Sequence, residues 1–481
     1  ELDQGFIKRE LERRARNEKR GKRVDKEDYE FYDITSWSLP LAFGVEAYWT
    51  EDAPSVKSAR VDGNAVTFSP SYKDPAGSQL KAADGQPLPG TGGSVEGGRA
   101  GSAYIMPYGS DAAARLAIAL LREGFKLAVA TRQLNANGRN WPSGTLVARV
   151  HRNPDTLHAR VAALAVDTGA RVIAAHSAFA DEGDTGIGSE SVVSLKQPRV
   201  AVVWDEGASP TSVGAMWFTL ERGYSLEFTP ITFATLKSVD LSKFNVIVLP
   251  DGSPGAFQSS LGKEGIDKLR GWVSAGGVLI GIGGGATMLA NKDVNLSSSR
   301  LVGEEEQPAT STQPSPQPST QPAPGAPAQS STQSPPAGQK EKKGDQTTTG
   351  KPEEKPAEKK KPTEPIAVPG SAFRARLDRD HFLSYGYGAG DLVVLMGGDT
   401  FFKPSKEGAN VVKFAAEGQL LVSGFEWPDN TEELLKGTSY LIDEPTGRGH
   451  IILFAEDPNF RYLWRSSTQL FLNAILLASA L

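Results

Sequence analysis

The sequence predicts an α/β protein with two α/β units, the second of them built on an open, mostly parallel sheet. From residue 101 onward, short apolar runs alternate with longer stretches of helical period. Residues 304–365 lack valine, isoleucine, leucine, methionine and every aromatic residue, so they cannot contribute to a core. The hydrophobic share of 39% and the 51 glycines leave enough apolar residues elsewhere for globular units.

Composition narrows the classes of function. A net charge of −5 over 481 residues produces no field that attracts nucleic acid or an acidic membrane. The absence of cysteine excludes disulfides, thiolate zinc sites and cysteine nucleophiles. The chain starts at Glu1 without a methionine or a visible signal peptide, so we expect a processed product or a fragment. We predict no transmembrane segment, because no apolar run is suited to a spanning helix.

Residues 1–98 are predicted to form an irregular, partly β segment. Residues 6–23 are basic with interleaved glutamates, which indicates a solvated connecting helix. A nucleic-acid arm is the alternative, but it lacks the interleaved aromatic residues that stack on bases, so no nucleic-acid partner is expected. Residues 29–49 are rich in aromatic side chains and are expected to pack as a loop plus a strand, and residues 51–98 as short strands and long loops.

Residues 99–198 are predicted to form the first, small α/β unit. Its expected strands lie at residues 103–106, 126–130, 145–150 and 171–175. Ser110 is the expected N-cap and Gly124 the expected C-cap glycine of one helix. A second helix is expected at residues 154–168.

Residues 199–303 and 366–481 are predicted to form the second unit, interrupted by a disordered insertion at residues 304–365. Its expected strands lie at residues 200–204, 246–249, 278–282, 392–396, 411–414, 420–423 and 450–454. Its expected helices lie at residues 212–222, 263–275, 286–290 and 467–480. The last of these helices is apolar on most faces, which indicates that it is packed inside the protein.

The five histidines show no pattern of zinc ligands. None is followed by glutamate three positions later, and no two are four positions apart. The nearest pair, His151 and His158, is separated by a proline and the expected start of a helix. We therefore predict no metal site and no cofactor in this chain.

One glycine-rich turn has the form of a nucleophile elbow. Residues 281–285 (Gly-Ile-Gly-Gly-Gly) join an expected strand to an expected helix, as G-x-S-x-G does in hydrolases. The flanking glycines are present, but the central Gly283 has no side chain, so the nucleophile is absent. The N–H groups of Gly283 and Gly284 could hold an anion in a small-ligand sensor, although the turn matches neither a dinucleotide fingerprint nor a P-loop.

Acidic residues follow two of the expected parallel strands. Ligands of open α/β sheets bind beyond these carboxyl ends, where a hydrolase run by carboxylates would need its acids to converge in one pocket. The alternative is that each acid caps a helix or a loop. No residue is predicted to be catalytic. The candidate ligand-binding residues are Asp205, Glu206 and Asp251, the possible partner Arg461 after a later strand, and Gly283 and Gly284 of the elbow.

The second unit resembles a class I glutamine-amidotransferase-like domain over residues 199–290 and 392–481. The resemblance is carried by residues 200–204, 246–251, 276–286 and 447–454. Active members of that family have a cysteine at the elbow, assisted by a His–Glu pair near the C-terminus. Here Gly283 stands at the elbow, and His450 is not followed by glutamate two residues later. The resemblance implies a flavodoxin-like or amidotransferase-like sheet without the activity.

The chain as a whole also resembles the C-terminal region of large secreted bacterial proteins that begin with a zinc carboxypeptidase (carboxypeptidase A-like) domain. The segments that carry this resemblance are residues 32–40 with Gly44-Val45, residues 141–147 (Trp-Pro-Ser-Gly-Thr-Leu-Val) and residues 205–207 (Asp-Glu-Gly). The His-x-x-Glu zinc motif of that family is not in this sequence. The resemblance therefore implies a secreted or periplasmic protein whose zinc is bound only in a peptidase domain that precedes residue 1.

We therefore predict a non-catalytic accessory region, which packs on or regulates a peptidase domain or binds its substrate. The expected partners are an upstream or associated peptidase domain and a polypeptide or glycan; the oligomeric state is not indicated. One alternative is that the chain is part of an active zinc metallocarboxypeptidase whose catalytic domain precedes residue 1. Another is a small-ligand-binding sensor domain.

Overall fold

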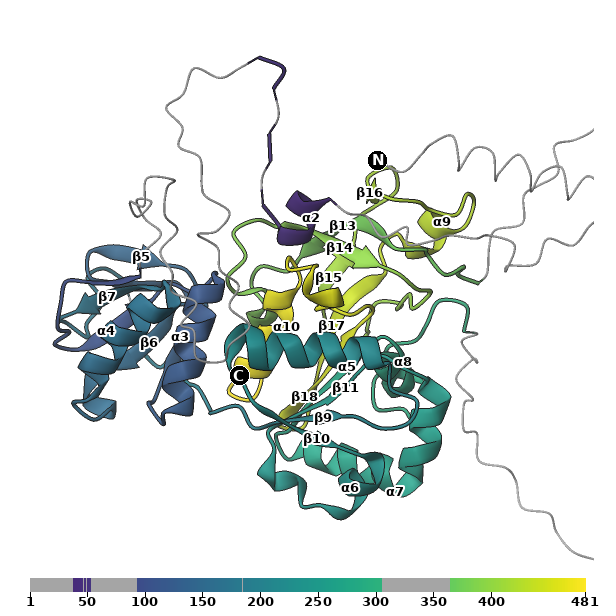
Figure 1. Cartoon of the computed structure of the whole chain (residues 1–481), viewed down its shortest axis with the longest axis horizontal. Helices are drawn as coiled ribbons and strands as arrows, with labels where there is room; N and C mark the ends of the chain where they lie inside the picture. Colours follow the sequence, from purple (N-terminus) through teal and green to yellow (C-terminus); the bar gives the residue numbers. More distant parts are fainter. Residues whose placement is uncertain (1–37, 46, 49, 53–92, 184, 305–363) are drawn as a thin grey trace, which may run out of the picture. The chain divides into compact units, whose positions relative to one another are not determined.

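A computed structural model describes residues 38–45, 47–48, 50–52, 93–183, 185–304 and 364–481. Within these residues the chain forms two large β-sheets with helices packed on them (Figure 1), which confirms the predicted α/β class. The predicted basic helix at residues 6–23 lies outside the described residues, as does nearly all of the predicted disordered insertion.

The first sheet has the strand order β1-β7-β2-β6-β3-β8. Its strands are β1 (Ser94–Glu96), β2 (Ala103–Met106), β3 (Ala128–Ala130), β6 (Leu146–Arg149), β7 (Arg171–Ala175) and β8 (Val192–Ser194). The neighbours β1 and β7 are parallel, and the other neighbouring pairs are antiparallel. The first unit is therefore an α/β unit on a mainly antiparallel sheet.

Both faces of the first sheet are buried. Successive side chains of a strand point to opposite faces, so Tyr104 of β2 packs in the main core while its neighbour Ile105 packs in a separate cluster. The elements that cover the sheet are α3 (Asp111–Arg122), α4 (Leu157–Thr168) and the hairpin of β4 (Leu134–Ala136) and β5 (Arg139–Trp141). The Ser110 hydroxyl accepts the N–H of Ala113 and so caps α3, as predicted.

The second sheet has the strand order β10-β9-β11-β12-β18-β17-β15-β13-β14, with β16 paired to β13. Its strands are β9 (Val200–Val203), β10 (Phe228–Ile231), β11 (Val246–Leu249), β12 (Val278–Ile282), β13 (Ser371–Leu377), β14 (Asp391–Met396), β15 (Ala409–Phe414), β16 (Leu421–Ser423), β17 (Ser439–Thr446) and β18 (Gly449–Phe454). The strands from β10 to β18 in this order are parallel, and the others are antiparallel.

The parallel strands of the second sheet follow the order 2-1-3-4-5 when they are numbered along the chain, which is the flavodoxin-like order of doubly wound folds. In such an order the direction of winding reverses between β9 and β11. Because β12 pairs with β18, chain stretches on both sides of residues 305–363 contribute to one sheet. This topology confirms the predicted open α/β sheet, whose parallel strands continue into an antiparallel part that the prediction of a mostly parallel sheet did not include.

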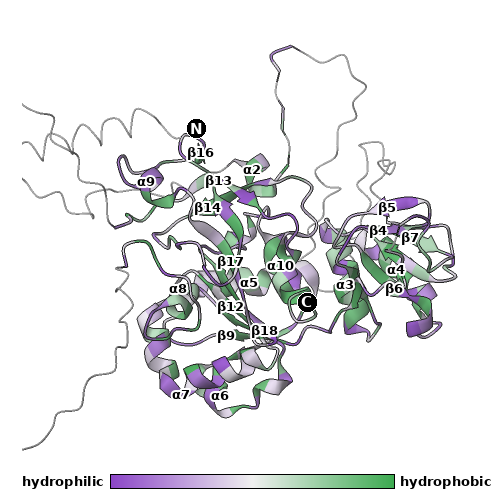
Figure 2. Cartoon of the chain, turned by 180° about the vertical axis from the view of Figure 1, so that it is seen from behind, coloured by the Kyte–Doolittle hydropathy of each residue, from purple (hydrophilic) through white to green (hydrophobic). Residues whose placement is uncertain are grey.

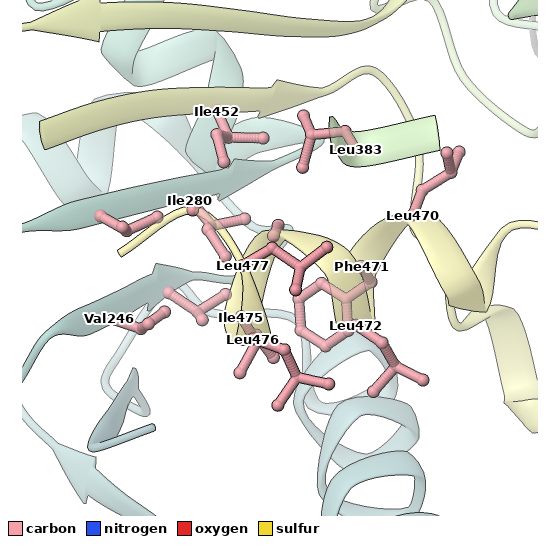
Figure 3. Packing of buried hydrophobic residues seen from close by; sticks show 14 of the residues in the cluster. Val246, Ile280, Leu383, Ile452, Leu470, Phe471, Leu472, Ile475, Leu476 and Leu477 are labelled. Carbon is pink, nitrogen blue, oxygen red and sulfur yellow. The ribbon is translucent and has the colours of Figure 1, made fainter. Parts of the chain in front are cut away.

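Helices cover both faces of these parallel strands. They are α5 (Pro210–Trp217), which continues as the π-helical η4 (Phe218–Gly223), α6 (Phe233–Ser238), α7 (Pro254–Ser274), α8 (Gly284–Ala290) and α10 (Thr468–Leu476). The short helix α9 (Thr431–Leu435) lies near β16 at the antiparallel end of the sheet. Figures 1 and 2 show α5 and α7 on opposite sides of the parallel strands, and Figure 2 shows hydrophilic residues on the outer surface of α7. In Figure 3, Phe471 and Ile475 of α10 pack near Ile280 of β12, as expected for the apolar closing helix.

One local prediction was wrong, and two helices differ in detail from their predictions. The part of residues 29–49 expected as loop plus strand contains a helix, α2 (Leu39–Phe43), which has Pro40 in its first turn and ends at Gly44 with φ 63°. The helix expected at residues 263–275 is present after a kink at Gly262, but the helical stretch that precedes the kink, which starts at Pro254 and is capped by the Ser253 hydroxyl, was not predicted. The helix expected at residues 212–222 is present, but the α geometry that was predicted throughout changes to π geometry at Phe218.

Candidate functional site

The loops that follow the parallel strands meet at one edge of the second sheet. The N–H of Ser209, after β9, donates to the carbonyl of Asp251 at 2.8 Å, and the N–H of Ser253 donates to the carbonyl of Gly207 at 2.8 Å. The N–H of Gly283, after β12, donates to the carbonyl of Phe454 at 2.9 Å. The edge therefore includes the switch point between β9 and β11, where doubly wound folds bind their ligands.

The glycine-rich turn between β12 and α8 is folded as a tight elbow. Gly283 has φ 51° and ψ −115°, which a residue with a side chain adopts only with strain. A Cβ at Gly284 would lie 1.8 Å from the carbonyl oxygen of Gly252, and one at Gly285 would lie 2.6 Å from that of Leu249. Glycines are thus required here so that the turn can approach the backbone that follows β11.

The carboxylate of Asp251 occupies the elbow. Its Oδ1 accepts the N–H of Gly284 at 2.8 Å, and a Cβ on Gly283 would lie 2.4 Å from the same oxygen. In an active elbow, the nucleophilic side chain projects from the central residue, and the N–H of the next residue stabilises the oxyanion. In this chain one carboxylate takes both the space of the missing side chain and the N–H donor.

No imidazole follows β18 at this edge. The residues directly after the strand are Ala455, Glu456 and Asp457. His450 lies at the other end of β18, where it pairs with Val278 at the start of β12. The elbow therefore lacks a nucleophile and also a histidine base from β18.

His450 instead belongs to a buried cluster on the amino-end side of the parallel strands. Its Nδ1 lies 2.9 Å from Oδ1 of Asp443, while Nε2 of His381 lies 3.2 Å from Oδ2 of the same carboxylate. Asp443 is only 1% exposed. Burial alone would raise the pKa of Asp443, but hydrogen bonds from His381 and His450 hold it below its usual value.

Two further acids reinforce the carboxyl-end edge. Asp457 is buried, and burial raises its pKa to about 7, although its carboxylate accepts hydrogen bonds from the N–H of Asn459 and the hydroxyl of Ser212. The Ser212 oxygen also accepts the N–H of Asp251 at 3.3 Å. Burial likewise raises the pKa of Glu456, which accepts the N–H of Gly397 at 2.7 Å. These acids connect loops through hydrogen bonds.

The structure separates the acids that the sequence placed at this edge. Oδ2 of Asp205 accepts the N–H of Phe233 at 2.8 Å, in the first turn of α6. Asp251 accepts the N–H of Gly284, the first residue of α8. The side chain of Glu206 is exposed. Asp251 therefore comes together with Gly283 and Gly284, whereas Asp205 is bound to a different helix.

Arg461 lies in an unusual stretch of backbone after β18. Its guanidinium stacks over the ring of Phe460, with 5.0 Å between Cζ and the ring centroid. Arg461 and Tyr462 both have positive φ, 49° and 54°. The structure thus gives Arg461 a defined aromatic contact; its predicted pairing with one of the acids stays a prediction.

Sequence reasoning missed the roles of Ser212, Glu456 and Asp457. Glu456 and Asp457 follow β18 in the same way that Asp205 and Glu206 follow β9, so the rule that selected the earlier acids also applies to them. Ser212 lies inside a helix and has no local pattern that marks it.

Within the described ranges, no three side chains of histidine, aspartate or glutamate are grouped so that they could hold a metal ion. In the same ranges no helix combines the length and the apolar character that crossing a membrane requires.

Comparison with known proteins finds similarity only at the level of solved structures; no family model and no curated protein matches. A ThuA-like protein from Bacteroides uniformis ATCC 8492 is 11% identical, with a TM-score of 0.34, over 58% of this chain and 89% of its own. A glutamine amidotransferase from Thermotoga maritima is 12% identical, with a TM-score of 0.30, over 57% and 84%. A β-galactosidase from Bacillus circulans sp. alkalophilus is 13% identical, with a TM-score of 0.30, over 58% and 31%.

The similar structures thus include ThuA-like and glutamine-amidotransferase-like proteins, as the resemblance of the second unit implies. Identities and TM-scores this low support no conclusion about activity. Nothing in the comparisons supports the carboxypeptidase resemblance. What the chain itself shows is a doubly wound α/β sheet whose elbow has glycine at the centre and a carboxylate bound to it.

Proposed function

We propose that this chain is a non-catalytic accessory region of a secreted peptidase-like protein, which packs against a zinc carboxypeptidase domain or binds its polypeptide substrate. The observation that supports the proposal is the contact between Asp251 and Gly284 at 2.8 Å. It fills the elbow from within the same chain, so the turn is a structural element rather than a reaction site.

The chemistry of the edge agrees with this proposal. Acyl transfer at an elbow needs a nucleophile, a base and N–H donors that are free to stabilise the oxyanion. Residue 283 supplies no nucleophile, and the N–H of Gly284 is bound to Asp251. The remaining acids, Glu456 and Asp457, accept backbone N–H groups of neighbouring residues and loops. A small-ligand sensor at the elbow would first have to displace the Asp251 carboxylate.

The same edge presents an aromatic residue to solvent. Trp204 directly follows β9 and is 55% exposed, next to the exposed Glu206 at the switch point. Exposed tryptophan is enriched among the residues that dominate protein–protein binding energy. The carboxypeptidase resemblance supplies the class of partner, so we assign Trp204 to the contact with the peptidase domain.

Isothermal titration of the chain with an inactivated zinc carboxypeptidase domain of the resembled family tests the proposal. We expect saturable binding that Trp204→Ala weakens about tenfold or more, which corresponds to the loss of a binding hot spot. The matched control is Phe179→Ala, which removes an aromatic ring that is 84% exposed in the first unit and leaves binding unchanged. Absence of binding, or equal effects of the two variants, would contradict the packing of this chain against a peptidase domain through Trp204.

A further inference from the structure

A groove of about 630 Å³ lies beside the first unit, away from the elbow. Its size falls within the range of small-ligand sites, roughly 300–1,000 Å³. The residues that line it include Arg132, Gln133, Asn140, Trp141, Ser143 and Asp380. All of them except Asp380 come from the segment around the hairpin of β4 and β5, and Asp380 comes from the loop after β13.

The walls of the groove are held in place by specific contacts. The indole Nε1 of Trp141 donates to the carbonyl of Ala136 at 2.9 Å, within the hairpin. The hydroxyl of Tyr385, five residues after Asp380, donates to the carbonyl of Thr131 at 3.2 Å. Gly144 has φ 90°, and a Cβ there would lie 2.6 Å from Cβ of Tyr385, so only glycine permits this approach. The groove is therefore preformed.

The polar groups of the groove have unused hydrogen-bonding capacity. In the described parts of the chain, the guanidinium of Arg132 and the carboxylate of Asp380 form no ion pair with each other or with another residue, and both residues are exposed. Oδ1 of Asn140 accepts from Nδ2 of Asn135 at 2.7 Å, which leaves the Nδ2 donors of Asn140 for a ligand. Gln133 and Ser143 add groups that both donate and accept.

The character of these groups selects the ligand. One positive and one negative side chain cancel, so the groove favours a neutral molecule over an anion or a cation. Its lining combines hydrogen-bond donors and acceptors with the ring of Pro142 and the largely buried Trp141, which add a small apolar surface. A sugar matches this combination, because each hydroxyl donates and accepts and the ring C–H groups are apolar. A peptide bound through its side chains would need apolar pockets, which these polar side chains do not form.

We infer that this groove binds a neutral oligosaccharide. The site lies in a different part of the molecule from the elbow and from Trp204, so it goes beyond the proposed function and does not depend on it. Arg132 donates hydrogen bonds to sugar hydroxyls, and Asp380 accepts hydrogen bonds from them. The amide of Asn140 donates to a hydroxyl between these two. The ligand lies along the hairpin of β4 and β5 with Pro142 against one face of a sugar ring.

Calorimetric titration of the full chain with neutral tetrasaccharides tests the inference, using β-1,4-glucan, β-1,4-linked N-acetylglucosamine and α-1,4-glucan as probes. We expect at least one to bind, and we expect Arg132→Ala and Asp380→Ala each to weaken binding about tenfold, the effect of losing one good polar contact. The matched controls, Arg152→Ala and Asp293→Ala, change exposed residues outside the groove and leave the affinity within about twofold. Melting temperatures confirm that every variant is folded.

Three outcomes overturn the inference. The first is that no tetrasaccharide binds at millimolar concentration. The second is that binding is equal in the groove variants and in the controls. The third is that an unstructured peptide binds the groove and displaces any bound sugar, which would make the site a peptide site. None of these outcomes bears on the binding of a peptidase domain, so the two proposals fail separately.

Discussion

Oδ1 of Asp251 lies 2.8 Å from the backbone nitrogen of Gly284 and 2.4 Å from the position that a Cβ of residue 283 would occupy. Two residues that are far apart in the sequence are thus closely coupled. The elbow is closed by a side chain of the same protein, and this contact determines what a substitution on either side does to stability.

Replacing Gly283 by alanine should lower the free energy of unfolding by about 2–4 kcal/mol. The strain of a positive φ contributes roughly 1–3 kcal/mol, and the overlap with Asp251 adds to it. Urea unfolding measures the change. The control is Gly271→Ala in α7, where a Cβ meets nothing within 4 Å, and which should stabilise by about 0.5–1 kcal/mol. Equal effects of both substitutions would refute the close contact.

The overlap also predicts a coupling between positions 251 and 283. Asp251→Ala alone should cost about 1–2 kcal/mol, because the N–H of Gly284 loses its acceptor. In the double variant Asp251→Ala/Gly283→Ala the overlap with Oδ1 and Cγ is removed and only the 3.2 Å approach to Cβ of residue 251 remains, so the total loss should be smaller than the sum of the single losses. Strictly additive losses in urea unfolding would show that the two residues do not meet.

The raised pKa of Asp457 predicts that the protein becomes less stable as the pH rises from about 4 to 7. Burial raises its pKa in the folded state to about 7, whereas the unfolded chain releases this proton near 3.9. Between about pH 4 and 7 the folded state therefore binds a proton that the unfolded state lacks, so this residue lowers stability as the pH rises. Asp457→Asn should be more stable than the natural chain at pH 8, by up to about 4 kcal/mol, and should lose that advantage at pH 4.

Melting temperatures at pH 5 and pH 8 measure this effect. The control Glu206→Gln removes an exposed carboxylate near the same edge and should shift neither value. An equal destabilisation by Asp457→Asn at both pH values would mean that the carboxylate is charged and well bound in the folded protein.

The buried cluster of His381, Asp443 and His450 should lose stability as the pH falls. This is the opposite of the effect expected for Asp457. Because the two histidines hold the pKa of Asp443 below its usual value, its contribution to stability is present above about pH 4 and disappears as the pH falls through the lower folded-state pKa. Asp443→Asn should therefore cost about 2–3 kcal/mol at pH 7, with a smaller difference at pH 3. Urea unfolding at both pH values checks this, with Asp293→Asn as the exposed control; a difference that does not depend on pH would contradict it.

Strands with unbroken apolar runs were well predicted from the sequence. The strands at residues 103–106, 171–175, 246–249 and 278–282 have the predicted bounds, because burial on both faces leaves a clear pattern. β17 was missed since it contains Asp443 and Glu444. Both acids are buried and accept hydrogen bonds from other parts of the chain, so the apolar run of Tyr440, Leu441 and Ile442 ends after three residues.

The strands β10, β4 and β5 were also missed, for different reasons. β10 is an edge strand that contains Pro230, and proline argues against a strand unless the strand is at an edge. The hairpin of β4 and β5 turns through Asn137 and Gly138, which both have positive φ. Asn-Gly is a strong local indication of such a turn, so this hairpin was predictable.

The elbow was predictable from its glycines, but its occupant was not. Asp251 follows β11 and Gly283 follows β12, and only the strand order of the sheet places them side by side. The same holds for Ser212 and Asp457, which meet because β18 returns to the centre of the sheet. The apolar pattern of one sequence predicts where each strand ends. It does not predict the strand order, which decides which strand ends become neighbours.

The most direct test of the central claim is a search for turnover by the purified chain itself. Peptides with free C-terminal residues, glutamine and an activated ester are each incubated with the chain and with Asp251→Ala, with and without a chelator, and products are followed by mass spectrometry. The occupied elbow predicts no product above the buffer rate in any reaction. Chelator-sensitive release of a C-terminal residue, or hydrolysis by the natural chain that Asp251→Ala abolishes, would contradict the account.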